Sequence, residues 1–103
     1  MNRHLFVQQI EWNGITIEVT YEPDWLSSEY LGEATAHLQV RSLKPERAPL
    51  PITETGYKSL FIAASSVQEA GGPLVFAREW LDLVADQPEW RRAQEEARQY
   101  RLF

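Results

Sequence analysis

Residues 15–22 read Ile-Thr-Ile-Glu-Val-Thr-Tyr-Glu, a stretch in which apolar and polar side chains alternate at every position. Successive side chains of a β-strand point to opposite faces, so this alternation predicts a strand with one buried face. The dipeptide Asn13-Gly14 stands directly before it and readily adopts the positive φ angles of a two-residue hairpin turn. Residues 5–12 supply the partner strand, and we therefore predict a β-hairpin over residues 5–22.

Two further strands are expected after the hairpin. Pro23 should end the second strand, and residues 22–33 show no clear period, which predicts a loop with at most one helical turn. Alternation returns over residues 34–43. A proline-rich connection follows at residues 44–51, and residues 52–62 are again β-forming, with Gly56 as a bend. The expected sheet is an antiparallel meander of about four strands, at residues 5–12, 15–22, 34–43 and 52–62.

The hydrophobic period then changes to that of helices. Ser65 and Ser66 each stand three residues before a Gln or Glu, a capping-box pattern that predicts a short helix over residues 66–70. A proline after two glycines suits the start of a helix over residues 73–85, whose wide apolar stripe indicates burial against the sheet. A third helix is predicted over residues 87–100, also packed on the sheet. Its narrow apolar seam consists of Trp90, Ala93, Ala97 and Tyr100.

These elements predict a single α+β domain over residues 1–103, in which residues 101–103 are either packed or a free tail. The chain is 44% hydrophobic and 12% aromatic, which is enough for one core. It has no cysteine, which excludes disulfides, thiolate zinc sites and cysteine nucleophiles. The net charge of −5 argues against nonspecific binding to nucleic acid, because that charge does not attract a polyanion. No uncharged stretch reaches membrane-spanning length, so we expect a cytoplasmic protein without membrane association. We also expect no cofactor and no metal, and the sequence leaves the oligomeric state open.

Two histidines limit the acid-base chemistry that the chain could perform. His4 stands near the N-terminus, whereas His37 lies on the polar side of a predicted strand. A small ligand-binding site or active site could combine His37 with Glu54 and Tyr57. The alternative is structural, because the threonines of residues 52–57 can bond the backbone and shape a tight turn without a ligand.

The predicted loop at residues 22–33 combines acidic and aromatic side chains and contains no Lys or Arg. Aromatic rings anchor protein interfaces and charge steers partners toward them, so this loop is a candidate protein-binding surface. Alternatively, Trp25 and Leu26 fold back and cover the open edge of the core. The candidate binding residues are Glu22, Asp24, Trp25, Glu29, Tyr30 and Glu33.

The chain ends in Gln-Tyr-Arg-Leu-Phe. This tail resembles the sliding-clamp-binding pentapeptide of bacterial replication and repair proteins, in which a Gln and two further residues precede Leu-Phe. Gln99, Leu102 and Phe103 match that pattern, while Tyr100 and Arg101 depart from its commonest second and third residues. The resemblance implies recruitment to the clamp. The alternative is that the two last residues pack on the body of the domain.

Several short motifs stand along the whole chain: Trp12-Asn13-Gly14-Ile15, Tyr21-Glu22-Pro23, His37-Leu38, Leu50-Pro51-Ile52, Gly71-Gly72-Pro73 and Trp80-Leu81-Asp82. As a set they resemble a family of small uncharacterised proteins of bacterial plasmids and integrative mobile elements. The resemblance implies an accessory role in replication, host defence or conjugation.

The leading hypothesis is a non-enzymatic inhibitor of a host defence nucleoprotein, similar in scale to anti-CRISPR proteins. The first alternative is a replication or repair accessory protein bound to the sliding clamp. The second is the small ligand-binding domain or enzyme.

Overall fold

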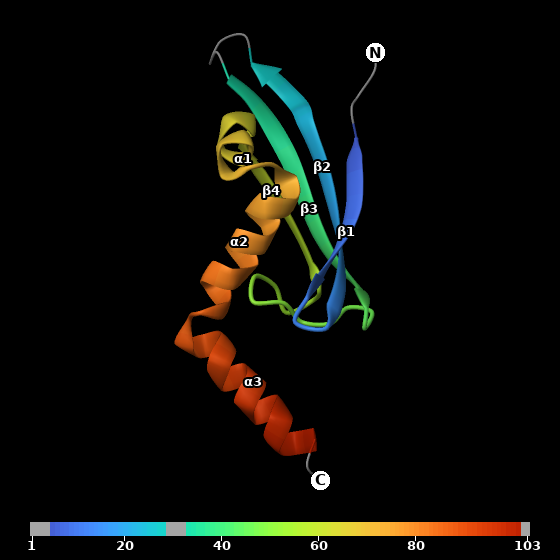
Figure 1. Ribbon diagram of the computed structural model, residues 1–103, viewed down its shortest axis with the longest axis vertical. Coiled ribbons are helices and arrows are strands. Elements are labelled where there is room, and N and C mark those ends of the chain that lie inside the picture. Colours follow the sequence, from blue (N-terminus) through green and yellow to red (C-terminus); the bar gives the residue numbers. More distant parts are fainter. Residues whose placement is uncertain (1–4, 29–32, 102–103) are drawn as a thin grey trace.

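The computed structural model describes residues 5–28 and 33–101 and has an α+β fold (Figure 1). A four-stranded antiparallel sheet comes first and three helices follow it, as predicted. The strands are β1 (Phe6–Trp12), β2 (Ile15–Ser28), β3 (Glu33–Lys44) and β4 (Tyr57–Ala63), in the sheet order β1-β2-β3-β4. The helices are α1 (Ala64–Ala70), α2 (Pro73–Ala85) and α3 (Pro88–Arg101).

The hairpin of β1 and β2 confirms the prediction from the alternating stretch. Asn13 and Gly14 have φ angles of 48° and 78°, and Trp12 pairs with Ile15 across the turn. Ile17 is completely inaccessible to solvent, so the apolar face of β2 lies in the core. The Asn13-Gly14 turn and the alternation of residues 15–22 agree with each other. The turn fixes the register of the hairpin, and this register places the alternating apolar side chains of residues 15–22 on one face.

Strands β2 and β3 are longer than predicted and replace most of the predicted loop at residues 22–33. β2 continues through Pro23 and pairs with β3 on both sides of it. The register between the two strands shifts between Glu22 and Leu26. Because proline lacks the N–H of a regular ladder, an irregularity of this kind accommodates Pro23 within the strand. The prediction that Pro23 ends β2 was wrong for that reason.

Strand β4 starts at Tyr57, whereas a strand was predicted over residues 52–62. Leu50 and Thr53 instead exchange two backbone hydrogen bonds, with N···O distances of 2.8 and 3.0 Å. The hydroxyl groups of Thr53 and Thr55 donate to the carbonyl oxygen of Tyr57, at 2.9 and 3.3 Å. Side chains that bond the local backbone compete with a strand ladder, so the β-forming composition of this segment misplaced the start of β4.

Helix α1 continues directly from β4 and begins at Ala64 rather than within the predicted range 66–70. The capping position is Ala63, and no side-chain hydrogen bond caps the helix there. Ser65 and Ser66 therefore lie inside the first turn, and the predicted capping role was wrong. The sequence pattern could not show that the strand runs without a break into the helix.

The glycines after α1 end that helix as predicted. Gly71 has a φ angle of 112°, and its N–H donates to the Gln68 carbonyl at 3.1 Å. The N–H of Gly72 donates to the Val67 carbonyl at 3.0 Å. A left-handed glycine with these bonds satisfies the last carbonyls of a helix. α2 then begins and ends at the predicted residues, and α3 begins and ends one residue later than predicted.

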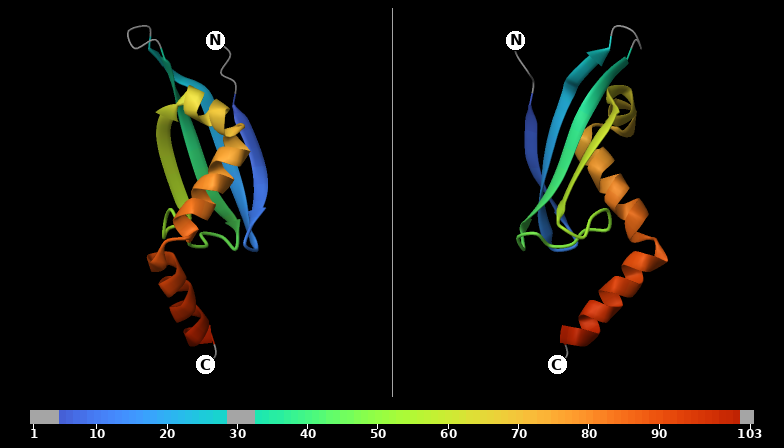
Figure 2. Two further views of the ribbon diagram at one scale, coloured as in Figure 1. Left: turned by 60° about the vertical axis from the view of Figure 1, so that its left-hand side comes forward. Right: turned by 180° about the vertical axis from the view of Figure 1, so that it is seen from behind.

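The helices α1 and α2 cover one face of the sheet (Figure 2). α1 packs on β3 and β4, whereas α2 packs on β1 and β2. The core between the two layers contains apolar side chains from the sheet, the proline-rich connection and both helices. The buried apolar residues are Ile10, Trp12, Ile17, Val19, Tyr21, Ala36, Leu38, Val40, Leu50, Val67, Ala77 and Leu81.

Trp12 joins the first hairpin to the helices. Its indole N–H donates to a carboxylate oxygen of Asp82 in α2 at 2.8 Å. Its ring centroid lies 6.3 Å from that of Trp90, near the start of α3. A buried tryptophan N–H needs an acceptor, and Asp82 supplies it, so this pair fixes the C-terminal part of α2 against the hairpin.

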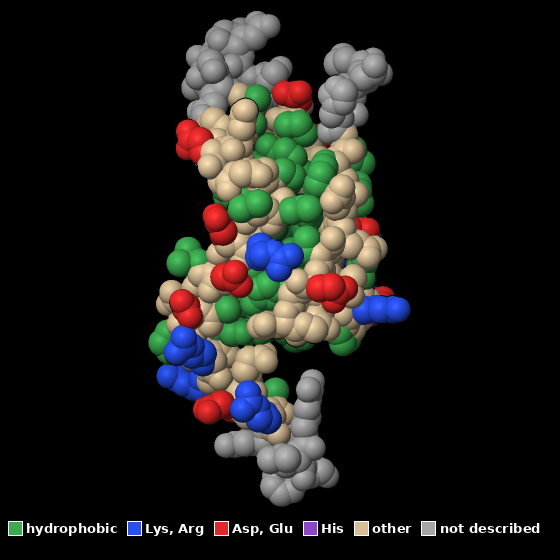
Figure 3. Space-filling view, in the orientation of Figure 1, with side chains coloured by type: hydrophobic (Ala, Val, Ile, Leu, Met, Phe, Trp, Pro, Cys, Tyr) green, Lys and Arg blue, Asp and Glu red, His purple; other side chains and the backbone are tan. Residues whose placement is uncertain are grey.

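α2 and α3 are less buried than predicted. In α2 only Ala77 and Leu81 are buried, while Leu83 is 67% exposed. α3 extends beyond the end of the sheet, and both basic and acidic side chains lie along it (Figures 1 and 3). Residues 91–98 are all exposed, so Ala93 and Ala97 of the predicted seam do not dock on the sheet. An amphipathic pattern does not tell how far a helix extends past the surface that it packs on.

Candidate functional site

One face of the sheet is covered by α1 and α2, and we call the opposite face the outer face. Cross-strand pairing arranges its side chains in rows, because directly paired residues point to the same side of a sheet. Nearest the connection between β2 and β3, Thr35 pairs with Ala63 on this face. In order from that end, the next rows are Glu22, His37 and Phe61; Val7, Thr20, Gln39 and Ser59; Gln9, Glu18, Arg41 and Tyr57.

Trp25, His37 and Phe61 pack against one another at this end of the outer face, and we call them the aromatic cluster. The ring centroids of Trp25 and His37 lie 4.6 Å apart, and those of His37 and Phe61 lie 4.7 Å apart. The centroids of Trp25 and Phe61 are separated by 5.9 Å. Rings attract one another at these distances. Trp25 is 37% exposed and Phe61 56% exposed, so the cluster presents apolar ring surface to solvent.

The irregularity in β2 places Trp25 in this cluster. It interrupts the strict alternation between Glu22 and Leu26, and the ring of Trp25 comes to lie against the side chain of His37 in the neighbouring strand. Trp25 therefore packs on the outer face, and it does not cover the edge of the core. Glu22 lies opposite His37 in the register of β2 and β3 and is only 7% exposed. Asp24, in contrast, is exposed. Of these two predicted binding carboxylates, Asp24 alone lies at the surface.

The charge of Asp24 also affects the pKa of Tyr21, a core residue of the same strand. Burial raises the pKa of the Tyr21 hydroxyl above its ordinary value of 10.0, and the negative charge of Asp24 raises it further. Both effects favour the neutral phenol. The negative charge of Asp24 therefore influences Tyr21, at the end of the sheet that carries the aromatic cluster.

The described part of the chain covers only some of the predicted binding residues. Glu33 begins β3 and Gln99 lies in α3, but the structure describes the side chain of neither. Their contacts therefore stay predictions. The same holds for the predicted binding residues outside the described ranges, which are Glu29, Tyr30, Leu102 and Phe103.

The structure does not bring His37, Glu54 and Tyr57 into one site. His37 pairs with Phe61, whereas Tyr57 pairs with Arg41, four residues further along β3. A strand rises about 3.3 Å per residue, so His37 and Tyr57 lie roughly 13 Å apart. Glu54 lies in the turns before β4, in a different hollow that residues of α2 and α3 also line. The threonine hydroxyls beside it bond the backbone, which fits the structural alternative for this segment.

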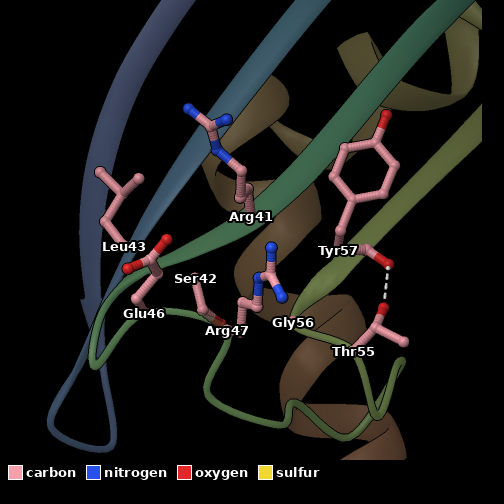
Figure 4. Close-up of a pocket in the computed structure, with 8 residues that line it drawn as sticks. All are labelled: Arg41, Ser42, Leu43, Glu46, Arg47, Thr55, Gly56 and Tyr57. Atoms are coloured by element: carbon pink, nitrogen blue, oxygen red, sulfur yellow. Dashed lines mark hydrogen bonds between the residues drawn. The ribbon is translucent and has the colours of Figure 1, made fainter.

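A hollow of about 620 Å³ lies at the opposite end of the outer face, beside the proline-rich connection (Figure 4). Arg41 and Arg47 contribute guanidinium groups to it, and Tyr57 contributes its ring. Arg41 already donates to Glu18 at 3.0 Å, and Glu46 also lines the hollow. Positive and negative side chains therefore balance there, and the hollow shows no clear preference for an anion.

Sequence reasoning missed Phe61 as a surface residue. Tyr57, Ser59 and Phe61 share the outer face. The sequence of β4 does not alternate, because its residues 60–63 are all apolar, so the pattern did not indicate which face is covered.

Within residues 5–28 and 33–101, no group of three or more His, Asp or Glu side chains could hold a metal ion. None of the helices in this part of the chain is long and apolar enough to cross a membrane.

Comparison with known proteins gives one family match. No curated protein and no solved structure matches the chain. A family model described as the KlcB third domain matches residues 6–90, which run from β1 to the first turn of α3 and include the whole aromatic cluster. KlcB is a plasmid-associated protein family, which is consistent with the resemblance to proteins of mobile elements. Since the match covers most of its length, the chain belongs to the KlcB third-domain family.

Proposed function

We propose that this chain is a non-enzymatic accessory protein of a bacterial mobile element that acts by binding another protein. In the most concrete form of the proposal, it is an anti-defence inhibitor whose partner is a host defence nucleoprotein. The observation that carries the proposal is the aromatic cluster, in which Trp25 and Phe61 remain 37% and 56% exposed. Membership of a plasmid-associated family supports the mobile-element context.

The chemistry of the cluster is that of an interface centre. A few aromatic anchors supply most of the binding energy at protein interfaces, typically about 2 kcal/mol or more each. Trp25 and Phe61 both pack against the ring of His37, so little side-chain freedom remains to be lost on binding.

Charge supports the choice of partner. Asp24 is exposed beside Trp25, and the whole chain carries a net charge of −5. Proteins that hold nucleic acid neutralise phosphates with Lys and Arg, so the protein part of a nucleoprotein offers basic surface. An acidic surface with aromatic anchors can compete for that surface, and its charge speeds the encounter.

An interference assay tests this function. The measurement is the fraction of cells with an active defence nucleoprotein in which a targeted plasmid becomes established, with and without the chain. We expect the wild-type chain to raise this fraction and Asp24→Lys combined with Trp25→Ala to return it to background. The physical reason is the loss of an anchor and the reversal of a steering charge.

The matched control for that assay is Glu46→Lys combined with Tyr57→Ala at the opposite end of the outer face. Glu46 is exposed and Tyr57 is 45% exposed, so the control makes the same chemical changes on a surface of similar exposure. It should keep the activity of the wild-type chain. Equal activity of the two double variants would show that the aromatic cluster is not the inhibitory surface.

The sliding clamp is a second candidate partner. The observation that favours it is that α3 extends beyond the end of the sheet (Figure 1). Residues 91–98 of this helix, which precede the tail motif, are all exposed. Recovery of the clamp by the wild-type chain, and its loss on deletion of Leu102 and Phe103, would favour this candidate.

A further inference from the structure

An apolar groove lies on the helix side of the sheet, between α2 and β4. Its volume is about 330 Å³. Phe76 and Trp80 of α2 form one wall with their ring centroids 6.3 Å apart, and Leu60 of β4 forms the other. Glu79 and Leu83 line its rim. We call these five residues the α2–β4 groove.

The path of α2 explains why the groove exists. The helix crosses the sheet obliquely and packs on β1 and β2, so it stands further from β4 (Figure 2). Leu60, Phe76 and Trp80 pack against the core and remain partly accessible, while Leu83 is 67% exposed. The groove is therefore an open extension of the core.

β4 forms one edge of the sheet, and no described element lies beyond it. The alternate backbone N–H and C=O groups of an edge strand point away from the sheet and can pair with another strand. Its sequence, Tyr-Lys-Ser-Leu-Phe-Ile-Ala, has no proline or glycine, and Lys58 is its one charged residue. Few of the features that usually protect an edge from pairing are present here.

We propose that β4 and the α2–β4 groove together bind an extended peptide segment of a partner protein, which adds to the sheet as a fifth strand. The outward backbone groups of β4 supply the hydrogen bonds, and the groove takes alternate side chains of the peptide. The groove volume is at the low end of the range for small-molecule sites, which suits one or two apolar side chains. Glu79 makes no ion pair with a described residue, so it selects a Lys or Arg beside the apolar positions.

This inference does not rest on the proposed function, because the groove uses neither Asp24 nor Trp25. Both surfaces meet at β4, where Leu60 points to the groove and its neighbour Phe61 to the outer face. The two proposals can therefore fail separately.

Selection from a phage-displayed library of random 12-residue peptides tests the inference on the full chain. We expect enriched peptides with bulky apolar residues at positions i and i+2 and a nearby Lys or Arg. Leu83→Glu should weaken the selected peptide by tenfold or more, since a charge then stands at the rim of the apolar groove. Val7→Glu adds the same charge to a 49% exposed position of the other edge strand and should leave the affinity unchanged.

Amide hydrogen exchange of the peptide complex supplies the second readout. Strand addition should slow exchange at alternate residues of Tyr57–Ala63, because their outward N–H groups become bonded. The inference is overturned if no peptide is enriched or if the peptide tolerates Leu83→Glu. It is equally overturned if the amides of β4 stay unprotected, or if β4 pairs with a second copy of the chain so that peptides are excluded.

Discussion

Replacing Gly56 with alanine is expected to lower the free energy of unfolding by about 2–5 kcal/mol. Gly56 has a φ angle of 77°, and an alanine Cβ there would lie 2.7 Å from the Cα and carbonyl carbon of Arg47. The left-handed backbone costs about 1–2 kcal/mol for a residue with a side chain, and overpacking adds about 1–3 kcal/mol. The backbone cannot easily retreat, because the Ser42 N–H donates to the Gly56 carbonyl at 2.8 Å.

Gly14→Ala is the matched control, and urea denaturation is the measurement. Gly14 has nearly the same φ angle, 78°, but no atom lies within 4 Å of the position of the added Cβ. Only the backbone contribution of about 1–2 kcal/mol applies there. Equal losses at the two positions would contradict the close contact between Gly56 and the proline-rich connection.

Leu81→Ala is expected to cost about 2–5 kcal/mol of unfolding free energy, because it opens a cavity under α2. Leu81 is completely inaccessible to solvent in the core, whereas Leu83, two residues further along the same helix, is 67% exposed. Leu83→Ala should therefore change the stability by no more than about 0.5 kcal/mol. Thermal and urea unfolding of both variants measure the difference.

The pair of leucines also tests the orientation of α2. A loss above roughly 1 kcal/mol for Leu83→Ala, well beyond the usual effect of a surface substitution, would mean that Leu83 is packed. The α2–β4 groove would then be closed, and the sheet edge beside it would be covered.

The parts of the fold that depend on local chemistry could be predicted from the sequence. The Asn13-Gly14 turn, the alternation of β2 and the glycines after α1 each fix the backbone over a few residues. Pro23 shows where local reasoning fails. A proline ends a strand in isolation, but pairing with β3 on both sides outweighs that tendency once the register shifts.

The candidate site was predicted only in part, because it forms through the register of three strands. The composition of residues 22–33 indicated Asp24 and Trp25 as binding residues. His37 and Phe61 join Trp25 only because β3 and β4 place them as a direct pair beside the irregularity in β2. No spacing in the sequence fixes such a pairing before the start of β4 is known.

The α2–β4 groove could not be predicted from the sequence for a similar reason. The apolar stripe of α2 is wide enough to suggest complete burial. The angle at which α2 crosses the sheet decides which part of that stripe is covered, and that angle depends on contacts such as the one between Trp12 and Asp82. Exposure of Leu83 is a consequence of that packing.

Quantitative affinity purification from a plasmid-bearing bacterial host tests most directly the claim that the aromatic cluster binds a partner protein. The baits are the wild-type chain, Phe61→Ser and Tyr57→Ser, since Phe61 and Tyr57 lie on the same face of β4 and are 56% and 45% exposed. We predict that the wild-type chain and Tyr57→Ser recover the same defence nucleoprotein and that Phe61→Ser recovers at least about tenfold less, since losing one anchor costs about 2 kcal/mol. Equal recovery by all three baits, or recovery of the sliding clamp through the C-terminal tail alone, would contradict the claim.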